Sequence, residues 1–466
     1  MNFVTGQKQN ETHLRVTSPS RKAWTALVLA AVAFVSSGVA RAQVALIAQA
    51  TQPAQPTLAE PLRSAAVQGP GNASQPVTLI ELFKEGLAEQ PAIKARRSQA
   101  TAAEFDLQGG KWGRYPALSG SASATNQDSD SRSLRIEQPL WTGGRITGQI
   151  DLAQARLNQA QSTVSQTQQE VMLQLASGYF EVLRFEGRLV AAKQNTQEHQ
   201  RLLDLIHRRV KSEVSPESDL VLAESRFQLA KTEEIQIARQ LATLKHILAQ
   251  LVGRPVTAVA PISRPISFRG YKSSEEAIDV ALRFSPQVEA ARFEADAAAA
   301  EIDLAKSRTL PSIVAGYEYT WVDPTVGKSQ GVSFVALQYQ PGAGLSALTG
   351  AKSAEFRRQA AVDSIIAVER QLRAQLQAAL SDFSAFNDQL SPTKALLKGT
   401  SEVVDSYMRQ YQIGRKGWLD VLNAQREKTQ ALFAVADIES SVELTKVRLM
   451  LLTGDLRPDN YLSLHD

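Results

Sequence analysis

The chain has 466 residues, with 51 Lys and Arg against 47 Asp and Glu, no cysteine and 6% aromatic residues. The absence of cysteine excludes disulfide scaffolds, thiol catalysis, a lipidated N-terminal cysteine and metal sites with Cys ligands. A mean hydropathy of −0.20 excludes a bundle of membrane-spanning helices. The length exceeds one ordinary core and predicts repeated or elongated units, and the balanced charge gives little support for nucleic-acid binding.

The N-terminus has the pattern of a secretory signal peptide. Basic residues precede an apolar run, Trp24 to Val35, which is followed by Ala40-Arg41-Ala42. We predict a signal peptide over residues 1–42, cleaved after Ala42; the alternative is an N-terminal anchor helix. These residues hold five of the 51 basic and one of the 47 acidic side chains, so the remaining chain carries 46 of each. Residues 43–77, rich in Pro, Ala and Gln, predict a flexible leader.

The rest of the chain has the pattern of a tandem duplication. Pro286 follows Pro91 by 195 residues, and Pro311 follows Pro116 by the same interval. Further along, the segment from Asp420 repeats the segment from Asp219 at an interval of 201. This predicts a first repeat over 78–253, a linker over 254–273, a second repeat over 274–454 and a tail over 455–466. Each repeat is expected to contain a helix (79–109 or 274–308), two strands, a very long helix and a long helix.

Strands are predicted where prolines end the helical pattern, at 118–125 and 134–138 in the first repeat and at 313–321 and 332–339 in the second. In the third of these, Tyr317, Tyr319 and Trp321 share one face and alternate with more polar residues. Such alternation fits a membrane barrel, or equally a half-buried hairpin of a soluble domain. Four strands cannot close a barrel and lipid excludes open edges, so a barrel would require about twelve strands from three chains.

The predicted helices are unusually long. Residues 145–210 contain no proline, which predicts a helix on the order of 100 Å long. Apolar residues then recur at intervals of seven, at Ala223, Ala230, Ile237, Leu244 and Leu251. Heptads of this length favour coiled-coil packing over an ordinary helical bundle.

No pattern of catalytic or metal-binding residues is present in the sequence. The five histidines lack metal-ligand spacing and are expected on helix surfaces: His13, His199, His207, His246 and His465. Phosphate-binding and nucleophile-elbow motifs are absent as well. We expect no enzyme activity, no cofactor and no metal.

Two motifs resemble signatures of the TolC-like outer-membrane efflux protein family. The first runs from Gln138 to Arg145 (QPLWTGGR), and the second comprises Tyr411-Gln412-Ile413-Gly414 with the segment from Trp418 to Arg426 (WLDVLNAQR). The resemblance extends over about residues 78–454. It implies a mainly α fold with a small β part, built as a trimeric β-barrel of about 12 strands continuous with an α-helical coiled-coil tunnel. It further implies a passive exit duct in the outer membrane that extends into the periplasm.

The resemblance also implies partners and roles for particular residues. The partners are two more copies of the chain, outer-membrane lipid, a periplasmic adaptor and an inner-membrane transporter. The strand-to-helix passage is assigned to Pro139, Trp141, Gly143 and Gly144, and the lipid-facing strand to Tyr317, Tyr319 and Trp321. The tips that face the adaptor are assigned to Val214, Ser215, Pro216, Gly414, Arg415 and Gly417. The periplasmic gate is assigned to Asp420, Asn423, Lys416, Tyr411 and Asp219.

Within that gate, Asp420 is expected to form a ring of negative charge that favours cations. Asn423 stands where some members have a second acidic residue, which weakens the ring. A pair between Lys416 and Asp219 is the hypothesis for a latch of the closed state. The alternatives to an exit duct are a periplasmic coiled-coil adaptor or scaffold, and a secreted enzyme. No sequence motif supports the enzyme. The cargo, whether protein, drug or metal, is left open by the sequence.

Overall fold

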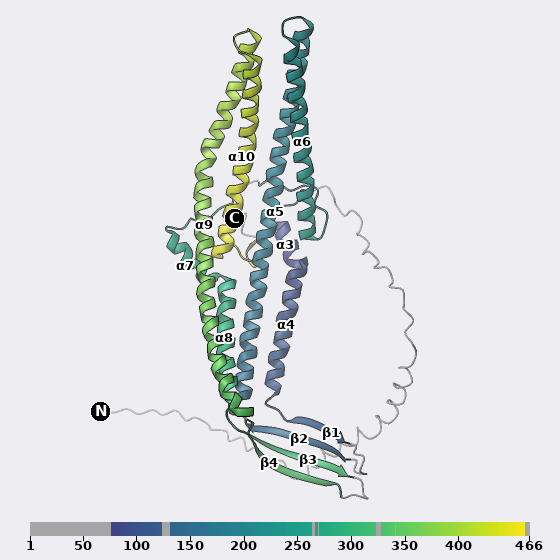
Figure 1. Cartoon of the computed structure of the whole chain (residues 1–466), viewed down its shortest axis with the longest axis vertical. Helices are drawn as coiled ribbons and strands as arrows, with labels where there is room; N and C mark the ends of the chain where they lie inside the picture. The colour runs from purple at the N-terminus through teal and green to yellow at the C-terminus, as the bar shows by residue number, and fades with distance from the viewer. Residues whose placement is uncertain are drawn as a thin grey trace, which may run out of the picture. The chain divides into compact units, whose positions relative to one another are not determined.

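The computed structural model describes residues 76–123, 131–262, 266–268, 270–322, 328–340 and 342–461. The predicted signal peptide and all but the last two residues of the predicted leader lie outside them. The same order of elements occurs twice in the described part (Figure 1). The first series is α3 (Leu79–Glu89), α4 (Pro91–Trp112), β1 (Ala117–Ser123), β2 (Ser131–Trp141), α5 (Arg145–Lys211) and α6 (Glu217–Val252). The second is α7 (Ser274–Phe284), α8 (Pro286–Ser307), β3 (Ser312–Val322), β4 (Gln330–Gln338), the short 3-10 helix η1 (Ala343–Leu345), α9 (Ser346–Gln412) and α10 (Trp418–Thr453).

The single first helix expected in each repeat is wrong, because a proline divides it. Gln90 is extended (φ −60°, ψ 121°) before Pro91, and Ser285 is extended (φ −75°, ψ 117°) before Pro286. A residue that precedes proline is sterically pushed out of the helical region, whereas proline itself suits the first position of a new helix. The prolines align the two repeats in the sequence, but the break that they cause in the helix was not predicted.

The four strands form one antiparallel sheet in the order β1-β2-β3-β4. The central pair, β2 with β3, joins the two repeats, with Arg135 opposite Glu318 and Leu134 opposite Tyr319. β1 and β4 are the edges of this sheet within the single chain. The second strand of each repeat is longer than predicted, since β2 begins at Ser131 and β4 begins at Gln330.

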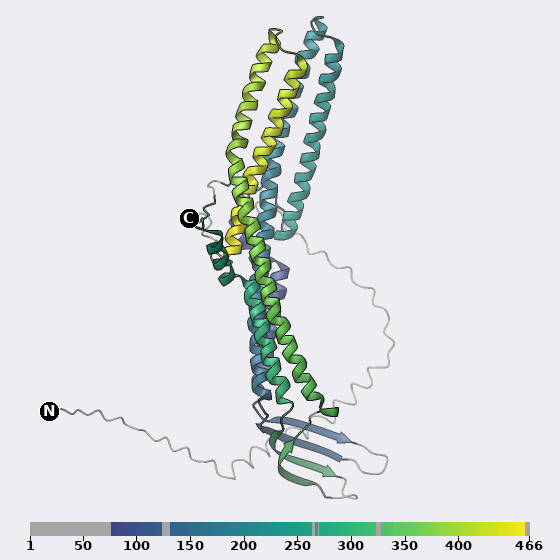
Figure 2. The same cartoon turned by 60° about the vertical axis from the view of Figure 1, so that its left-hand side comes forward.

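The two longest helices have 67 residues each, which corresponds to about 100 Å. They extend from the sheet past α3 and α7 to two tips (Figures 1 and 2). α5 contacts α4, α6, α8 and α10, whereas α9 contacts α7, α8 and α10. As a result α5 buries side chains along much of its length and α9 buries few.

The largest apolar core lies where α3 and α6 pack on the middle of α5. Phe83, Met172, Leu175 and Leu248 are fully buried there. Four smaller clusters are found among the described residues. One of them joins α7, α8, α9 and α10 around Ile278, and another joins α5, α6, α9 and α10 near the tips. Burial at about 25 cal/mol per Å² makes these clusters the principal source of stability.

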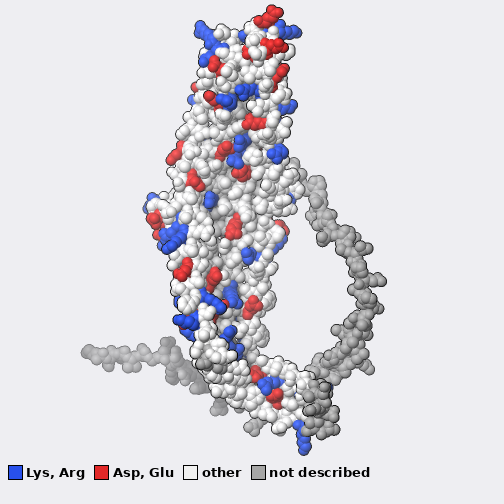
Figure 3. All heavy atoms as spheres, viewed as in Figure 1, with Lys and Arg blue, Asp and Glu red and all other residues white. Residues whose placement is uncertain are grey.

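The predicted heptad seam of α6 is largely buried. Ala223, Ala230 and Ile237 are buried, and Leu244 and Leu251 are partly buried against the main core. Among the described helices, none is both long and apolar enough to cross a membrane. On the face seen in Figure 3, charged side chains of both signs are spread over the helices and are sparse over the sheet.

Candidate functional site

The sheet has one apolar face and one polar face. Tyr317 and Trp321 of β3 lie on the same face, 42% and 39% exposed, and Ile136 of β2 pairs with Tyr317 there. Further large apolar side chains are exposed on this face: Leu118, Val335 and Leu337. The rings of Tyr319 and Trp321 meet edge to face, with their centroids 4.7 Å apart. An exposed apolar face of this kind is unfavourable in water and suited to lipid.

The opposite face carries hydroxyl groups and charges. Ser121 and Ser133 hydroxyls lie 2.9 Å apart across β1 and β2. Farther across the sheet, Arg135 Nη2 donates to Glu318 Oε2 at 2.6 Å, and Arg135 Nη1 lies 3.7 Å from Glu137 Oε2. The Arg135 guanidinium also lies over the Phe334 ring, 5.2 Å from its centroid. β4 departs from this separation, since Val332 pairs with Glu318 and is exposed on the polar face.

The passage from sheet to helix is a glycine turn. β2 shifts register between Pro139 and Trp141, and α5 begins four residues after Trp141 ends the strand, following Gly143 and Gly144. Both glycines have positive φ, +59° and +87°. A Cβ at Gly143 would lie 2.8 Å from Leu310 Cβ, whereas a Cβ at Gly144 would meet nothing within 4 Å. Gly143 is thus required by both backbone angle and space, and Gly144 by backbone angle alone.

The two tips use the same helix-ending hydrogen bonds. In the first, Val214 N donates to Arg209 O at 2.9 Å, and in the second, Arg415 N donates to Gln410 O at 2.9 Å. The left-handed residue that this ending requires is Gly414 (φ 74°) in the second tip and Glu213 (φ 57°) in the first. Val214 and Ile413 project from the tips, 62% and 66% exposed. Ser215 accepts from Arg209 Nε at 3.3 Å, and Pro216 precedes α6.

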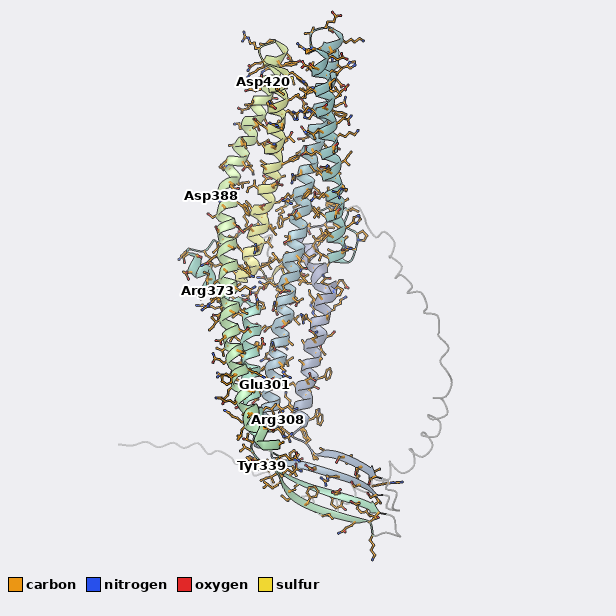
Figure 4. The ribbon with its side chains drawn as sticks, in the orientation of Figure 1. Glu301, Arg308, Tyr339, Arg373, Asp388 and Asp420 are labelled. Carbon is orange, nitrogen blue, oxygen red and sulfur yellow. The ribbon has the colours of Figure 1, made fainter. Side chains whose placement is uncertain are left out.

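Four of the five gate residues assigned from the sequence fall in and just below the second tip, whereas Asp219 lies in the first turn of α6, at the first tip. Asp420, in the first turn of α10 (Figure 4), accepts the Gly417 N–H at 3.1 Å. Lys416 Nζ lies 3.9 Å from Asp420 Oδ2 and 4.4 Å from the Tyr407 ring centroid. Among the described residues, the ion pairs of the chain do not include one between Lys416 and Asp219. Within one chain, Lys416 instead lies near Asp420, across the start of α10.

Tyr411 is buried rather than exposed at the gate. Its ring lies 5.5 Å from that of Trp418, and the Arg209 guanidinium lies over it at 4.9 Å. The Tyr411 hydroxyl and the Trp418 Nε1 are buried without a hydrogen-bond partner. These rings pack with Leu202 and other apolar residues of the tip cluster, which joins the two hairpins. Arg209 was not among the residues predicted for the gate, although it lies in the last turn of α5, directly before the first tip.

A buried polar group lies below the tip cluster and was not foreseen. Asn195 Oδ1 of α5 accepts from Thr429 Oγ1 at 2.8 Å and from Gln425 Nε2 at 3.3 Å, both of α10. One turn away, His199 is buried, which corrects its expected surface position. Burial first, and the charge of Arg226 second, lower the pKa of His199 below its ordinary 6.5.

These residues line a cleft of about 340 Å³ between α5, α6 and α10. Two guanidinium groups, those of Arg226 and Arg426, border it together with the carboxylate of Glu233. Among the described residues, no group of three or more His, Cys, Asp or Glu could hold a metal ion. The arrangement offers packing and charge along a helical surface, and among the described residues no set of catalytic groups has been brought together.

Comparison with known proteins identifies the family. The model of the family described as "Outer membrane efflux protein" matches residues 82–254 and again residues 277–455. The chain belongs to this family. Membership places the protein in the outer membrane with an extension into the periplasm, and it confirms the family resemblance carried by the two motifs.

Relatives agree with this assignment over most of their length. The chain is 23% identical to the outer membrane protein TolC of Vibrio cholerae over 399 residues, 81% of this chain and 91% of that protein. It is 22% identical to the cobalt-zinc-cadmium resistance protein CzcC of Cupriavidus metallidurans, covering 78% and 86% of the two chains. The solved structure of VceC, an outer membrane protein of V. cholerae, superposes with a TM-score of 0.70 at 18% identity, covering 81% and 96%. The mainly helical fold with a small sheet is confirmed by these matches.

Proposed function

We propose that three copies of this chain form one exit duct in the outer membrane. Each copy contributes its four-stranded sheet to a shared barrel of about twelve strands. The long helices form a coiled-coil tunnel in the periplasm, and the tips receive a periplasmic adaptor and an inner-membrane transporter. The duct is passive, and energy comes from that transporter.

The observation that carries the proposal is the two-faced sheet with open edges. β1 and β4 leave unpaired backbone groups, which hydrocarbon does not tolerate. Pairing of β4 with β1 of the next copy closes the barrel and satisfies both edges. Tyr317 and Trp321 then face lipid, and the Arg135–Glu318 pair faces the water-filled interior.

Exposed apolar side chains on the outermost helices support the same assembly. Trp112 and Phe105 of α4 are 68% and 64% exposed, and Phe356 of α9 is 66% exposed. α4 and α9 lie at opposite ends of the helical row, since α5 and α8 stand between them in the contact order. Packing α9 of one copy on α4 of the next would cover both sets.

The proposal is tested by fractionation and by conductance. We expect the protein in the outer-membrane fraction as a heat-modifiable trimer that conducts ions in a planar bilayer. A soluble periplasmic monomer would refute the duct and favour the second candidate, a coiled-coil adaptor or scaffold. The separate sheet with an exposed apolar face speaks against that candidate.

At the entrance, three Asp420 side chains would concentrate negative charge and favour cations. Asp420→Ala is expected to lower the ratio of cation to anion permeability at low salt, where screening is weak. Asn423→Asp, which restores a second acidic position, is the matched variant and should raise that ratio. Unchanged ion selectivity in both variants would refute the proposed ring of Asp420 side chains.

The latch between Lys416 and Asp219 is retained as a proposal for contact between neighbouring copies. Lys416→Asp should open the duct, and combination with Asp219→Lys should close it again. If the double variant conducts like Lys416→Asp alone, the two residues are not partners. The cargo is either a secreted protein or a small molecule or metal, and co-purification of the inner-membrane transporter would decide between them.

A further inference from the structure

A basic groove lies at the end of the helical row that is next to the sheet, and nothing in the proposed duct accounts for it. We propose that this groove binds an oxyanion, namely a solute that carries a phosphate group. The binding itself rests on the residues of one chain and not on the proposed function. Only its consequence, an anion site inside the duct close to the barrel, depends on that function.

Two neighbouring clefts make up the groove. The first, of about 600 Å³, lies between α5, α8 and the start of α9, and the second, of about 680 Å³, lies between α4, α5 and α8. Leu152, Arg156, Leu304 and Arg308 border both clefts. Because the clefts share this rim, they open on the same face of the helices. Volumes of this size accommodate a small-molecule ligand.

Guanidinium groups outnumber carboxylates along the groove. The first cleft is bordered by three arginines and one carboxylate, which are Arg156, Arg308, Arg357 and Glu301. The second is bordered by Arg156 and Arg308 again, together with Arg145 and Asp106. In each cleft, three positive charges against one negative charge leave an excess of two. Such an excess attracts anions to a recessed surface.

The carboxylates leave most of these arginines without a partner. Arg156 Nη2 donates to Glu301 Oε1 at 2.9 Å, which occupies the carboxylate of the first cleft. Among the described residues, the side chains of Arg145, Arg308 and Arg357 form no ion pair and no hydrogen bond. A guanidinium group presents several N–H donors in a fixed fork that matches the oxygens of a phosphate group. The groove therefore offers unused donors of the type that phosphate requires.

The start of α9 adds main-chain donors to the first cleft. Ser346, Ala347 and Gly350 border this cleft, and α9 begins at Ser346. The first N–H groups of a helix have no acceptor within the helix, and they carry a partial positive charge. The first turn of α9 contains no acidic side chain, and the carboxylate of Glu355, farther along, pairs with Lys352 at 2.7 Å. The positive end of this helix is thus left for a ligand.

The groove opens on the same side as the polar face of the sheet. Gln338 lies on that face, where its Nε2 donates to Glu137 Oε1 at 3.3 Å, and Gln340, two residues on, borders the first cleft. The acidic residues of the four strands are Glu137 and Glu318, so the acidic side chains seen on the sheet in Figure 3 mark its polar face. In the same view basic side chains are frequent over the helix ends next to the sheet, where Figure 4 labels Arg308. A water-facing side suits a solute rather than a lipid head group.

The ordinary roles of arginine at helix ends do not account for this group. Arg308 follows the last turn of α8, where a positive charge stabilises the carbonyl end of the helix. Arg145 is the first residue of α5, however, and a positive charge is unfavourable at the start of a helix. A bound anion would offset that cost together with the repulsion between the neighbouring guanidinium groups.

Calorimetric titration of the full chain in detergent with inorganic pyrophosphate tests the site. At low salt we expect saturable binding with a Kd of about 1 mM or below. Arg308→Gln removes the guanidinium that both clefts share and should weaken binding by about tenfold. Arg308→Lys keeps the charge but not the fork, so it should weaken binding by about threefold. Arg308 is exposed, so neither variant is expected to impair folding.

Arg358→Gln is the matched control for Arg357→Gln. The two arginines are adjacent in α9 and both are exposed, but only Arg357 borders a cleft. Arg357→Gln should weaken binding by about fivefold, and Arg358→Gln by less than about twofold. Equal weakening in these two variants, or no saturable binding up to about 10 mM pyrophosphate, would overturn the site.

Native mass spectrometry with added phosphatidylglycerol distinguishes a solute from a lipid head group. We expect Arg308→Gln to bind as much of this lipid as wild type does. Loss of bound lipid in Arg308→Gln, with pyrophosphate binding unchanged, would assign the groove to a lipid and overturn the solute site. The same spectra give the oligomeric state. A monomer that binds pyrophosphate as expected would refute the duct and leave the site standing, whereas a trimer without binding would do the reverse.

Discussion

Replacing Asn195 by alanine removes the acceptor that joins the two hairpins below their tips. Asn195 Oδ1 accepts from Gln425 Nε2 and Thr429 Oγ1, and all three residues are buried. In the variant, Thr429 keeps its bond to Gln425 O at 3.0 Å. Gln425 loses the hydrogen bond of its side-chain amide, because Asn195 Oδ1 was the acceptor for its Nε2, and its Oε1 is already buried without a partner.

One buried amide donor is thus left unsatisfied, which costs about 1–3 kcal/mol. A central value of about 2 kcal/mol corresponds to roughly a 30-fold rise in the local opening constant. We expect hydrogen exchange to rise by that factor at 191–203 of α5 and 421–433 of α10, and to stay unchanged in the sheet.

The control is Asn158→Ala, in the same helix. Asn158 accepts from Gln154 Nε2 at 2.9 Å, but this bond is exposed, so water replaces it at little cost. Its effect should stay within about 0.5 kcal/mol. If Asn195→Ala raises exchange less than twofold, or no more than the control does, the buried network does not hold the hairpins together.

Three further predictions concern the tips, the passage and pH. Glu213→Gly should stabilise the first tip by about 1 kcal/mol, because it removes a left-handed non-glycine residue (φ 57°); a lowered melting temperature would contradict this. Gly143→Ala should lower the melting temperature more than Gly144→Ala, since only the first adds a contact with Leu310 to the backbone strain; equal losses would show that the contact relaxes. The pKa of His199 is lowered from 6.5 by burial and by Arg226. Below about pH 6.5 the unfolded chain therefore binds a proton at this histidine while the folded chain does not, and the hairpin contact should lose stability. The loss ends at the pH where the packed histidine also binds its proton. Thermal unfolding between about pH 7 and pH 5 should show that loss in wild type and a reduced loss in His199→Gln, and identical profiles would refute it.

Much of the fold can be predicted from the positions of the prolines and from the spacing of the apolar residues. The long helix from Arg145 was predicted because no proline interrupts it, and it ends at Lys211, one residue past the prediction. β3 was predicted from the alternation of Tyr317, Tyr319 and Trp321, and it spans Ser312–Val322. Both elements depend on residues that are close together in the chain, so a single sequence is enough to predict them.

Contacts between distant segments were harder to predict. Nothing near His199 in the sequence indicates burial, because the residues that share its cleft, among them Arg226 and Thr429, come from α6 and α10. Lys416 was paired with Asp219 by resemblance, and that pair stays a prediction for neighbouring copies; within one chain Lys416 lies near Asp420, four residues on. Sequence shows which residues are available for such pairs, and packing between helices selects among them.

The two repeats have the same elements in the same order but bury them unequally. α5 and α9 have 67 residues each, yet α5 buries 20 of them and α9 buries six. The difference follows from position, since α5 stands between neighbours and α9 stands at the end of the row. Large side chains exposed on α9, among them Phe356 and Leu348, would cost stability in a free monomer at about 25 cal/mol per Å². A helix at the end of a row is covered only if another chain continues the row. An apolar outer helix and an unpaired edge strand at the same end of each chain therefore pose one requirement, which the proposed ring of three chains would meet.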